Sequence, residues 1–322
     1  MKEFSLIEKI FKPLTNGCKA AQNLADDVAK ISLKKDEELI ISKDVFVEDV
    51  HFLLADGGFK IASKLLRTNL SDLAASGAKP VYYMLGFSKN KKISEKFLSD
   101  FGKGLKSVQD EFGLDLIGGD TASSKKLFFS VTIFGIAKKA ENLSRQNAKA
   151  GDLIFVSGTI GDASLGLALR QKKIKADKKT AEFLLDRHFF PSPRIKLGRA
   201  LTQYKLAKCA IDISDGFLAD LRQICKSSAL DAEVFLEKFS FSKSAKKLET
   251  AAINLLAGGD DYELIFCAPK KNLQKILALK KSLQLEISCV GELKKMSKKS
   301  PQIILCDANS KKIPIKKFGY EH

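Results

Sequence analysis

Five aspartates that lie in short segments with small neighbours are the residues best suited to chemistry in this chain. They occur in LADDVAKI, ISKDVFVEDVHF, TNLSDLAASGAKP, LIGGDTASS and AIDISDGFLADL, as Asp27, Asp44, Asp72, Asp120 and Asp215. Carboxylates with small neighbours at strand ends are typical ligands of hard cations such as Mg2+, which can lie beside the phosphates of a nucleotide. The sequence spacing leaves open whether the five side chains converge.

The segment LIGGDTASS combines glycines with an acid. Gly118 and Gly119 could let a phosphate approach the backbone, and Asp120 could hold a metal ion, but a plain turn would use the same residue types. Asp72 lies on an expected helix of small and apolar residues. An acid on such a face costs desolvation free energy unless it is paired or metal-bound, whereas a capping or exposed position avoids that cost.

The segment AIDISDGF contributes two acids around the end of an expected strand. Alternation along the strand places Asp212 and Ser214 on one side and leaves Asp215 in the turn that follows. Acids at the carboxyl ends of strands commonly line sites in α/β folds. Ser214 or Asp215 would serve equally well as the N-cap of the next helix, so both interpretations stay open.

Two further segments carry glycines beside acids. LAGGDDYELIF places Asp260 and Asp261 directly before an expected strand, where they either shape a tight turn or face a cationic substrate. VSGTIGDASLGLAL lacks the GK[ST] of a Walker A loop and the GxGxxG pattern, which favours tight strand–helix packing over a nucleotide loop. The three histidines form neither a metal nor a Ser/His/Asp pattern, although His51 could contact a phosphate.

The elements that must position these residues alternate between strand-like and helix-like patterns. In the first half we expect strands at 38–47 (around a polar turn), 81–88, 115–119 and 126–137, and helices at 59–78 and 93–113. After the polar segment 138–152 we expect strands at 152–158, 209–214, 263–269, 286–291 and 302–308, and helices at 163–171, around Ala181 and Ile195, and at 217–228. The sequence therefore predicts an α/β (α+β) protein with domains at 1–145 and 146–322.

The composition limits the classes of protein that fit. With 322 residues, 45% of them apolar and 29% charged, the chain matches a soluble globular protein. No apolar run reaches the ~18 residues needed to span a bilayer. The N-terminal MKEFSLIEKIFKPL is typical of a short amphipathic helix rather than a signal peptide, so the expected location is cytoplasmic. The six cysteines include no CxxC pair, which favours buried free thiols over a zinc site or disulfides.

Lysine supplies most of the net charge of +17. Proteins that read nucleic acids favour arginine, interleaved aromatic residues or a recognisable module, and this sequence has none of these patterns. A solvated lysine-rich surface is therefore expected, with neither nucleic acid nor membrane as a partner. Such a surface would still attract anionic phosphorylated ligands.

The order and spacing of the motifs carry more information than any one of them. From Phe4 to His322 the chain contains FSLI, DD, KDVFVEDVHF, NLSDLAASGAKP, LIGGDT, SRQNAKAGD, VSGTIGD, RHFFPSPRIKLGRAL, AIDISDGFLADL, GGDDYEL and FGYEH. This series resembles the thiamine-monophosphate kinase family, in the superfamily of aminoimidazole ribonucleotide synthetase. The resemblance implies Mg2+-assisted transfer of a phosphoryl group from ATP to thiamine monophosphate, giving thiamine diphosphate without a side-chain nucleophile. It also implies a homodimer in which the N-terminal sheets of two copies complete a barrel.

The resemblance implies roles for individual positions as well. Several Mg2+ ions would be bound by Asp27, Asp44, Asp72, Asp120 and Asp215, with Ser42 in the same region, and we add Asp212 because it lies near the end of the expected strand that leads to Asp215. ATP would contact Gly119, Asp120, Arg145 and Ser214. Thiamine monophosphate would contact His51, Asp260 and Tyr320. The chain departs from the family pattern at Ala25, Lys43, Asp49 and Asp260.

Two other functions remain as alternatives. The first is another ATP-using member of the superfamily, but Cys18 lacks the Gly-rich context of the reactive residue in selenophosphate synthetases. The chain also ends in His322 rather than in the cysteine tail of the carbamoyl-dehydratase maturation member. The second alternative is a non-catalytic basic binding protein on the same fold. The complete set of five aspartates argues against it, because a protein without catalysis has no need for carboxylates near phosphate.

Overall fold

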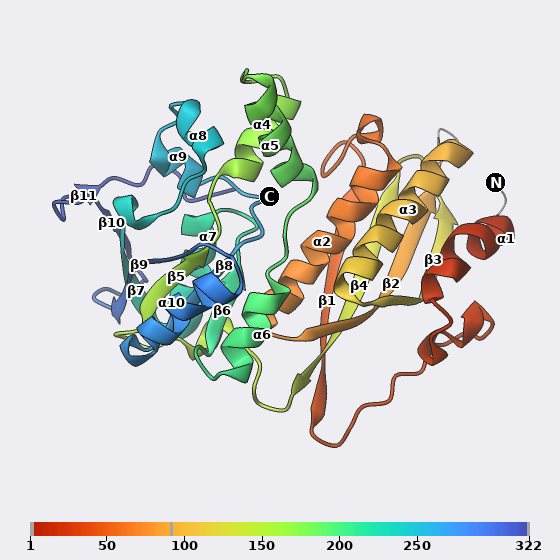
Figure 1. The fold of residues 1–322 in the computed structure, drawn as a ribbon, viewed down its shortest axis with the longest axis horizontal. Coiled ribbons are helices and arrows are strands. Elements are labelled where there is room, and N and C mark those ends of the chain that lie inside the picture. Colours follow the sequence, from red (N-terminus) through yellow and green to blue (C-terminus); the bar gives the residue numbers. More distant parts are fainter. Residues whose placement is uncertain (1–2, 91–92, 321–322) are drawn as a thin grey trace. The chain divides into compact units, whose positions relative to one another are not determined.

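A computed structural model describes residues 3–90 and 93–320 of the chain (Figure 1). Within these ranges the backbone forms two compact units. Unit 1 is the chain up to Leu73 together with Ala78–Ala140, and unit 2 is Ala74–Gly77 with the chain from Glu141 onward. The last two residues of the FGYEH motif lie outside the described residues.

Unit 1 is built on a mixed four-stranded sheet and two long helices (Figure 1). The strand order is β1-β4-β2-β3, with β4 antiparallel to both β1 and β2, and β2 parallel to β3. The elements are β1 (Glu37–Val47), α2 (Gly58–Ser76), β2 (Lys79–Lys89), α3 (Glu95–Phe112), β3 (Asp115–Ser123) and β4 (Phe128–Lys138). Before the sheet come α1 (Glu3–Leu6) and helical turns at Ile7–Phe11, Lys12–Thr15 and Lys19–Leu24.

One face of the unit 1 sheet forms the core with α2 and α3. Phe129 and Val131 of β4 are fully buried, and the ring of Phe129 lies 4.7 Å from that of Phe101 in α3. Phe128, on the other face of the same strand, is 38% exposed. Because successive side chains of a strand alternate between faces, the cross-strand partners of Phe129 and Val131 also point toward the helices.

Unit 2 is built on a seven-stranded sheet in the order β11-β10-β7-β9-β5-β8-β6. Neighbouring strands are antiparallel except for the parallel pair β10 and β7. The strands are β5 (Leu153–Ser157), β6 (Cys209–Asp212), β7 (Leu230–Phe235), β8 (Leu264–Ala268), β9 (Ile287–Lys295), β10 (Ile303–Cys306) and β11 (Lys312–Ile313). The helices are α4 (Asp162–Arg170), α5 (Lys178–Phe189), α6 (Ile195–Gln203), α7 (Phe217–Ser228), α8 (Lys243–Lys247), α9 (Ala252–Leu256) and α10 (Leu273–Ser282).

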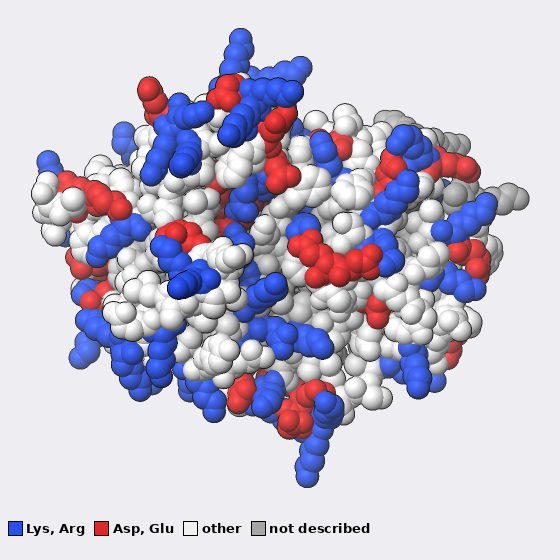
Figure 2. Space-filling view, viewed as in Figure 1, with Lys and Arg blue, Asp and Glu red and all other residues white. Residues whose placement is uncertain are grey.

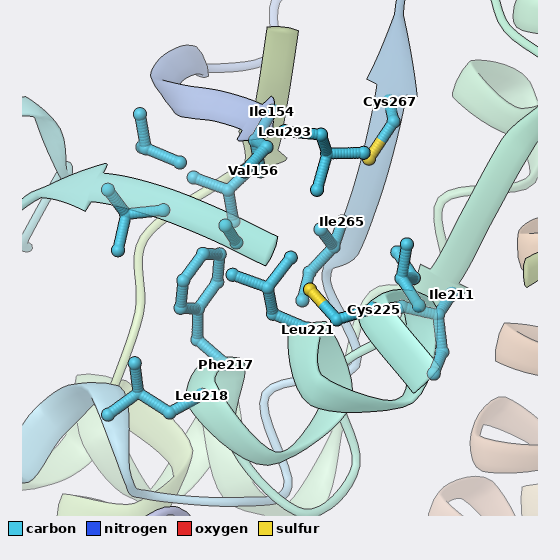
Figure 3. Close-up of a cluster of buried hydrophobic side chains, with 14 of the residues drawn as sticks. Ile154, Val156, Ile211, Phe217, Leu218, Leu221, Cys225, Ile265, Cys267 and Leu293 are labelled. Carbon is cyan, nitrogen blue, oxygen red and sulfur yellow. The ribbon is translucent and has the colours of Figure 1, made fainter. Parts of the chain in front are cut away.

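The core of unit 2 lies between α7 and the sheet (Figure 3). Phe217, Leu221 and Cys225 project from α7 toward Ile154 and Ile265 on the neighbouring strands β5 and β8. This packing orients α7 so that its first turn faces the loop after β6, which carries predicted site residues.

The surface and the thiols agree with the composition. Figure 2 shows lysine and arginine side chains spread over the visible face, with acidic side chains between them. All six cysteines are free thiols, four of them buried. None of the helices in the described ranges is long and apolar enough to cross a membrane.

Two segments in which a turn was considered are continuous strands. ELIISKDVFV pairs with β4 without a break, and the polar centre fits because the Lys43 amine donates a hydrogen bond to Ser130 Oγ at 2.6 Å. The prediction of a turn there is wrong. LIGGDTAS continues as β3, in which Asp120 pairs with Gly86 of β2, so the turn alternative for GGDT is also wrong. In both cases pairing with a neighbouring strand overrides the local turn preference.

Candidate active site

Two acids and a hydroxyl meet on the helix-covered face of the unit 1 sheet. Ser42 and Asp44 lie opposite Ile133 and Val131 of β4, whose side chains are buried. Asp72 reaches this face from α2, and the Ser42 hydroxyl donates a hydrogen bond to Asp72 Oδ2 at 2.5 Å. One strand and one helix therefore bring together three of the residues predicted to bind metal.

The electrostatics of this Ser42–Asp44–Asp72 group favour a bound cation. Burial, and then the negative charge of Asp72, raise the pKa of Asp44 to about 6. A divalent cation would offset both effects, and carboxylate and hydroxyl oxygens are the ligands that Mg2+ prefers. Among the described residues, no group of three or more His, Cys, Asp or Glu side chains is arranged to hold a metal ion. The group thus fits Mg2+ chemically but supplies only part of a ligand set.

A pocket of about 200 Å³ lies at the β3 edge of the same unit. Its lining includes Gly118, Gly119 and Asp120 of β3, and Asp27 from the loop before β1. Gly119 packs directly on β2, since a Cβ there would lie 2.0 Å from Leu85 O. Asp27 and Asp120, which are both exposed, therefore line one pocket.

The two acidic groups of unit 1 remain apart within one chain. The group around Asp44 and Asp72 includes β1, whereas Asp120 lies on β3, and these are the two edge strands of the sheet. Three strand spacings, about 14 Å, separate the edges. Unit 1 alone therefore does not gather its four predicted aspartates at one point, although the sequence left room for such a convergence.

Three segments of unit 2 that contain predicted site residues are joined by backbone hydrogen bonds. The Asp260 N–H donates to Ser214 O at 2.8 Å. The Tyr320 N–H donates to Asp215 O at 2.9 Å. Ser214, Asp215, Asp260 and Tyr320 are thus neighbours, although they come from three distant parts of the sequence.

The loop before α7 is capped by an acid that no motif singled out. The N-cap position is Gly216, and neither Ser214 nor Asp215 caps the helix with its side chain. Instead, Asp220 Oδ2 accepts hydrogen bonds from the N–H groups of Ser214, Asp215 and Gly216, each at 3.1 Å. Burial, and then the charge of Asp215, raise the pKa of Asp220 to about 7, although these three donors lower it. The N-cap alternative for Ser214 or Asp215 is wrong because an acid one turn further along satisfies the donors.

The adjacent acids of GGDDYEL have different surroundings. Asp261 is 1% exposed and accepts hydrogen bonds from the N–H groups of Gly161 and Ala163 at 2.7 and 3.3 Å, which fixes the start of α4. Burial raises the pKa of Asp261 well above its usual value. The side chain of Asp260 is 28% exposed. The alternative in which both acids face a cationic substrate is therefore wrong, and of the two only Asp260 is accessible.

A buried histidine lies behind Asp260. His188 of α5 is 2% exposed, and its Nδ1 lies 3.5 Å from Asp260 Oδ2. The Tyr262 hydroxyl donates a hydrogen bond to Asp260 Oδ1 at 3.3 Å. Asp260 and Tyr262 have left-handed φ values of 70° and 50°, which side chains rarely adopt. No local pattern indicated this role for His188, because it depends on α5 meeting a loop more than seventy residues away.

Directly after this loop, Glu263 leads into β8 through a buried cluster of charges. It is fully buried and accepts hydrogen bonds from Arg187 Nη2 at 2.8 Å, Arg194 Nε at 2.6 Å and Ser157 Oγ at 2.6 Å. Burial alone would raise the pKa of Glu263, but the charges of Arg194 and Arg187 outweigh burial and lower it. The arginines of RHFFPSPR thus anchor the end of the GGDDYEL loop.

The remaining predicted site residues, Arg145, His51 and Asp212, lie at or just after the ends of strands. Arg145 is exposed in a turn after β4, and its carbonyl accepts a hydrogen bond from Ser228 Oγ at 2.8 Å. His51 follows β1, and its Nδ1 accepts from the Val47 N–H at 3.1 Å. Asp212 is the last residue of β6 and is 5% exposed.

Comparison with known proteins defines the class. The family model for the N-terminal domain of AIR synthase related proteins matches residues 25–137, and the model for their C-terminal domain matches residues 149–304. Together they cover most of the chain and most of its α/β elements. The two-domain α/β fold expected from the sequence is that of the AIR synthase related proteins.

Similar proteins narrow the class further. The thiamine-monophosphate kinase of Buchnera aphidicola subsp. Schizaphis graminum is 38% identical, over 99% of this chain and 98% of its own. The crystal structure of thiamine-monophosphate kinase from Stenotrophomonas maltophilia K279a has a TM-score of 0.84 and 34% identity, covering 94% of this chain and 96% of that one. AaThiL complexed with AMPPCP and TMP has a TM-score of 0.77 and 26% identity, covering 99% and 97%. The chain belongs to the thiamine-monophosphate kinase family, as its motifs predicted.

Proposed function

We propose that this chain is a kinase that transfers a phosphoryl group from ATP to thiamine monophosphate and so makes thiamine diphosphate. Its relatives over the whole chain are named thiamine-monophosphate kinase, and AaThiL was solved with TMP and with AMPPCP, an ATP analogue. In the structure itself, the proposal rests on one observation, the pairing of Asp44 and Asp72 beside Ser42. Two carboxylates held together at a partly buried place are suited to a divalent cation and its phosphate ligands.

The residues proposed to hold several Mg2+ ions are those of both acidic groups of unit 1 and of the end of β6. They are Asp27, Ser42, Asp44, Asp72, Asp120, Asp212 and Asp215. Bound Mg2+ would neutralise phosphate charge and polarise the oxygens of the transferring group. The carboxylates contribute by fixing where that charge lies, because ATP and thiamine monophosphate are both anions that repel each other.

ATP is proposed to contact the backbone of Gly119, the carboxylate of Asp120, and the side chains of Arg145 and Ser214. Arg145 is exposed, while its own carbonyl is tied down by Ser228, so its guanidinium projects from a fixed turn. A guanidinium binds phosphate oxygens through charge-assisted hydrogen bonds and keeps its charge at any working pH. It therefore supplies a permanent cation to the phosphates.

Thiamine monophosphate is proposed to contact His51, Asp260 and Tyr320. Its thiazolium ring is a permanent cation, which suits the accessible carboxylate of Asp260 and the face of Tyr320, which is 56% exposed. His51 would bind the phosphate. The acceptor is already an anionic phosphate oxygen, so the reaction needs in-line positioning more than a side-chain nucleophile or a strong base.

We also propose the larger organisation that accompanies this activity. Residues 1–145 would form the metal- and ATP-binding domain, and 146–322 the second domain, in a cytoplasmic homodimer. On the sheet face away from α2 and α3, Ile41, Val45 and Phe128 are 55%, 42% and 38% exposed. A second copy that closes the sheet into a barrel would cover these side chains and remove both sheet edges.

The test is a direct assay of the purified protein with ATP, Mg2+ and thiamine monophosphate. We expect thiamine diphosphate and ADP to form in equal amounts, and we expect a chelator to stop the reaction. Reactions without thiamine monophosphate give the background of ATP hydrolysis. If no thiamine diphosphate forms over a range of Mg2+ concentrations, the proposed function is wrong.

A further inference from the structure

A single carboxylate oxygen holds the backbone of the loop between β6 and α7. Oδ2 of Asp220 accepts the N–H groups of Ser214, Asp215 and Gly216, each at 3.1 Å. Asp220 lies in the first turn of α7 and is 4% exposed. Three consecutive N–H groups that point at one oxygen restrict the torsion angles of the peptide units between them.

These three N–H groups would otherwise form an anion-binding concavity at the start of a twelve-residue helix. In this protein the concavity is filled by the chain's own carboxylate. A phosphate therefore cannot bind to these N–H groups, and the Asp220 carboxylate contacts backbone groups rather than a substrate. Its effect on a reaction must pass through the residues that it holds.

The other side of the same loop carries two segments of the proposed substrate site. Ser214 O accepts the Asp260 N–H at 2.8 Å, and Asp215 O accepts the Tyr320 N–H at 2.9 Å. The carboxylate thus fixes the N–H groups of two residues whose carbonyls place Asp260 and Tyr320. Both hydrogen bonds join backbone to backbone, with no side chain between the loop and the two substrate segments.

The 214–216 loop packs so closely against the segments that carry Asp260 and Tyr320 that a small displacement of the loop also displaces them. A Cβ at Gly259 would lie 2.5 Å from Ser214 O, and a Cβ at Gly319 would lie 2.5 Å from Asp215 O. Neither glycine leaves room for the loop to shift toward it. A change in the loop therefore moves both substrate segments instead of being absorbed between them.

We propose that Asp220 is a positioning residue for thiamine monophosphate, which sets the 214–216 backbone and through it the places of Asp260 and Tyr320. This inference rests on the proposed function and adds to it a residue that touches neither substrate. The inference predicts that loss of the Asp220 carboxylate lowers kcat/KM for thiamine monophosphate by more than any loss of stability could explain.

The chain offers a matched control in Asp231. This residue is also 4% exposed and also accepts three hydrogen bonds, from Ser297 N at 2.9 Å, Ser297 Oγ at 2.6 Å and Gln302 N at 2.7 Å. It lies in unit 2 as well, but the 297–302 loop that it holds contains no proposed site residue. Asp231→Asn and Asp220→Asn therefore each remove one carboxylate that holds a loop, although burial raises the pKa of Asp220, whereas for Asp231 hydrogen bonds outweigh burial and lower the pKa.

The experiment compares kcat and KM for both substrates in the unmodified protein, Asp220→Asn and Asp231→Asn, well below each melting temperature. We expect Asp220→Asn to lower kcat/KM for thiamine monophosphate by about 30- to 100-fold, mainly through KM, because small misplacements of binding groups have effects of this size. Asp231→Asn should keep both kinetic constants within about twofold of the unmodified protein, because the loop that it holds contains no proposed site residue. If the two variants have equal kinetic constants, the positioning role of Asp220 is refuted.

A second variant covers the case in which Asp220→Asn does not fold. Gly319→Ala adds one methyl group that would lie 2.5 Å from Asp215 O and 2.6 Å from the Cβ of Ala219, so the segment that carries Tyr320 must shift relative to the 214–216 loop. We expect a raised KM for thiamine monophosphate, measured well below the melting temperature of the variant, and an unchanged KM would overturn the inference. If the unmodified protein makes no thiamine diphosphate, the proposed function falls and the inference falls with it. If the unmodified protein makes thiamine diphosphate but neither variant changes the KM for thiamine monophosphate, only the inference about Asp220 is refuted.

Discussion

Replacing Asp44 by Asn should make the metal-free protein more stable at pH 8, although it removes a proposed catalytic ligand. The carboxylate lies beside Asp72 in a partly buried place, and its pKa rises from 3.8 to about 6 because of burial and of that neighbouring charge. Without a bound cation, ionisation of Asp44 therefore lowers the stability of the folded protein. The amide of Asn has the shape of the protonated carboxyl group and carries no charge at any pH.

The size and sign of the effect follow from linkage. The folded pKa lies above the unfolded value, so protonation of Asp44 stabilises the fold at low pH, and this stability is lost as the pH rises from about 4 to about 6. A shift of about two units corresponds to about 3 kcal/mol. At pH 8 in a chelator, Asp44→Asn should therefore be more stable than the unmodified protein by up to about 3 kcal/mol. Below pH 4 the difference should vanish.

Urea unfolding in a chelator at several pH values from 4 to 8 measures this difference directly. Asp220 also has a raised pKa, but it is present in both proteins and cancels in the comparison. Asp100→Asn is the control, because Asp100 lies on α3 in ion pairs with Lys96 and Lys103 that lower its pKa. That variant should show no gain in stability at pH 8.

Added Mg2+ should reverse the order of stability. It should stabilise the unmodified protein and have little effect on Asp44→Asn, because the variant lacks one charged ligand. If Asp44→Asn is less stable than the unmodified protein in chelator at pH 8, the carboxylate makes net favourable contacts. The assignment of Asp44 and Asp72 to a cation site would then be wrong.

Three further predictions concern other parts of the site. Asp72→Asn and Asp120→Asn should each lower kcat by about 10²-fold or more with an unchanged circular dichroism spectrum, and near-normal activity of both at limiting Mg2+ would refute the metal assignment. Asp260→Ala should raise the KM for thiamine monophosphate about 10- to 30-fold and leave that for ATP nearly unchanged, whereas a loss of thermal stability with an unchanged ratio of the two KM values would leave Asp260 only a role in shaping its loop. Glu263→Gln should lower the free energy of unfolding by about 3–5 kcal/mol in urea, because Arg187 and Arg194 lose their buried counter-charge; a loss below 1 kcal/mol would contradict this.

Most strands and the long helices of unit 1 could be predicted because their signals are local, whereas β7 and α10 were not expected. The apolar spacing of 59–78 and 93–113 gave α2 and α3 within two residues at most of their boundaries. The polar SKD and GGD sequences misled because Gly and Asp favour turns, while the structure pairs both segments along neighbouring strands. A strand's partners lie far away in the sequence, so no local pattern could correct this.

For the candidate site too, some features could be predicted from the sequence and others could not. The order of motifs predicted Ser214, Asp215, Asp260 and Tyr320 as candidate site residues, and two backbone hydrogen bonds make them neighbours in the structure. The motifs could not indicate that Asp220 holds the loop among them, because that contact depends on the direction in which α7 leaves β6. Nor could they indicate that Asp44 and Asp120 lie at opposite edges of one sheet, which follows from the strand order alone.

The unusual backbone of the GGDDYEL loop explains why so many buried charges surround it. Asp260 and Tyr262 both adopt left-handed φ values, each of which costs on the order of 1 kcal/mol for a residue with a side chain. On either side of Asp260 the chain is held firmly, by the Ser214 carbonyl at its N–H and by the buried Glu263 with two arginines beyond it. Such anchors hold the partly exposed carboxylate of Asp260 in one place. If Asp260 binds a small cation, as proposed, this fixed geometry outweighs the local cost of the left-handed backbone.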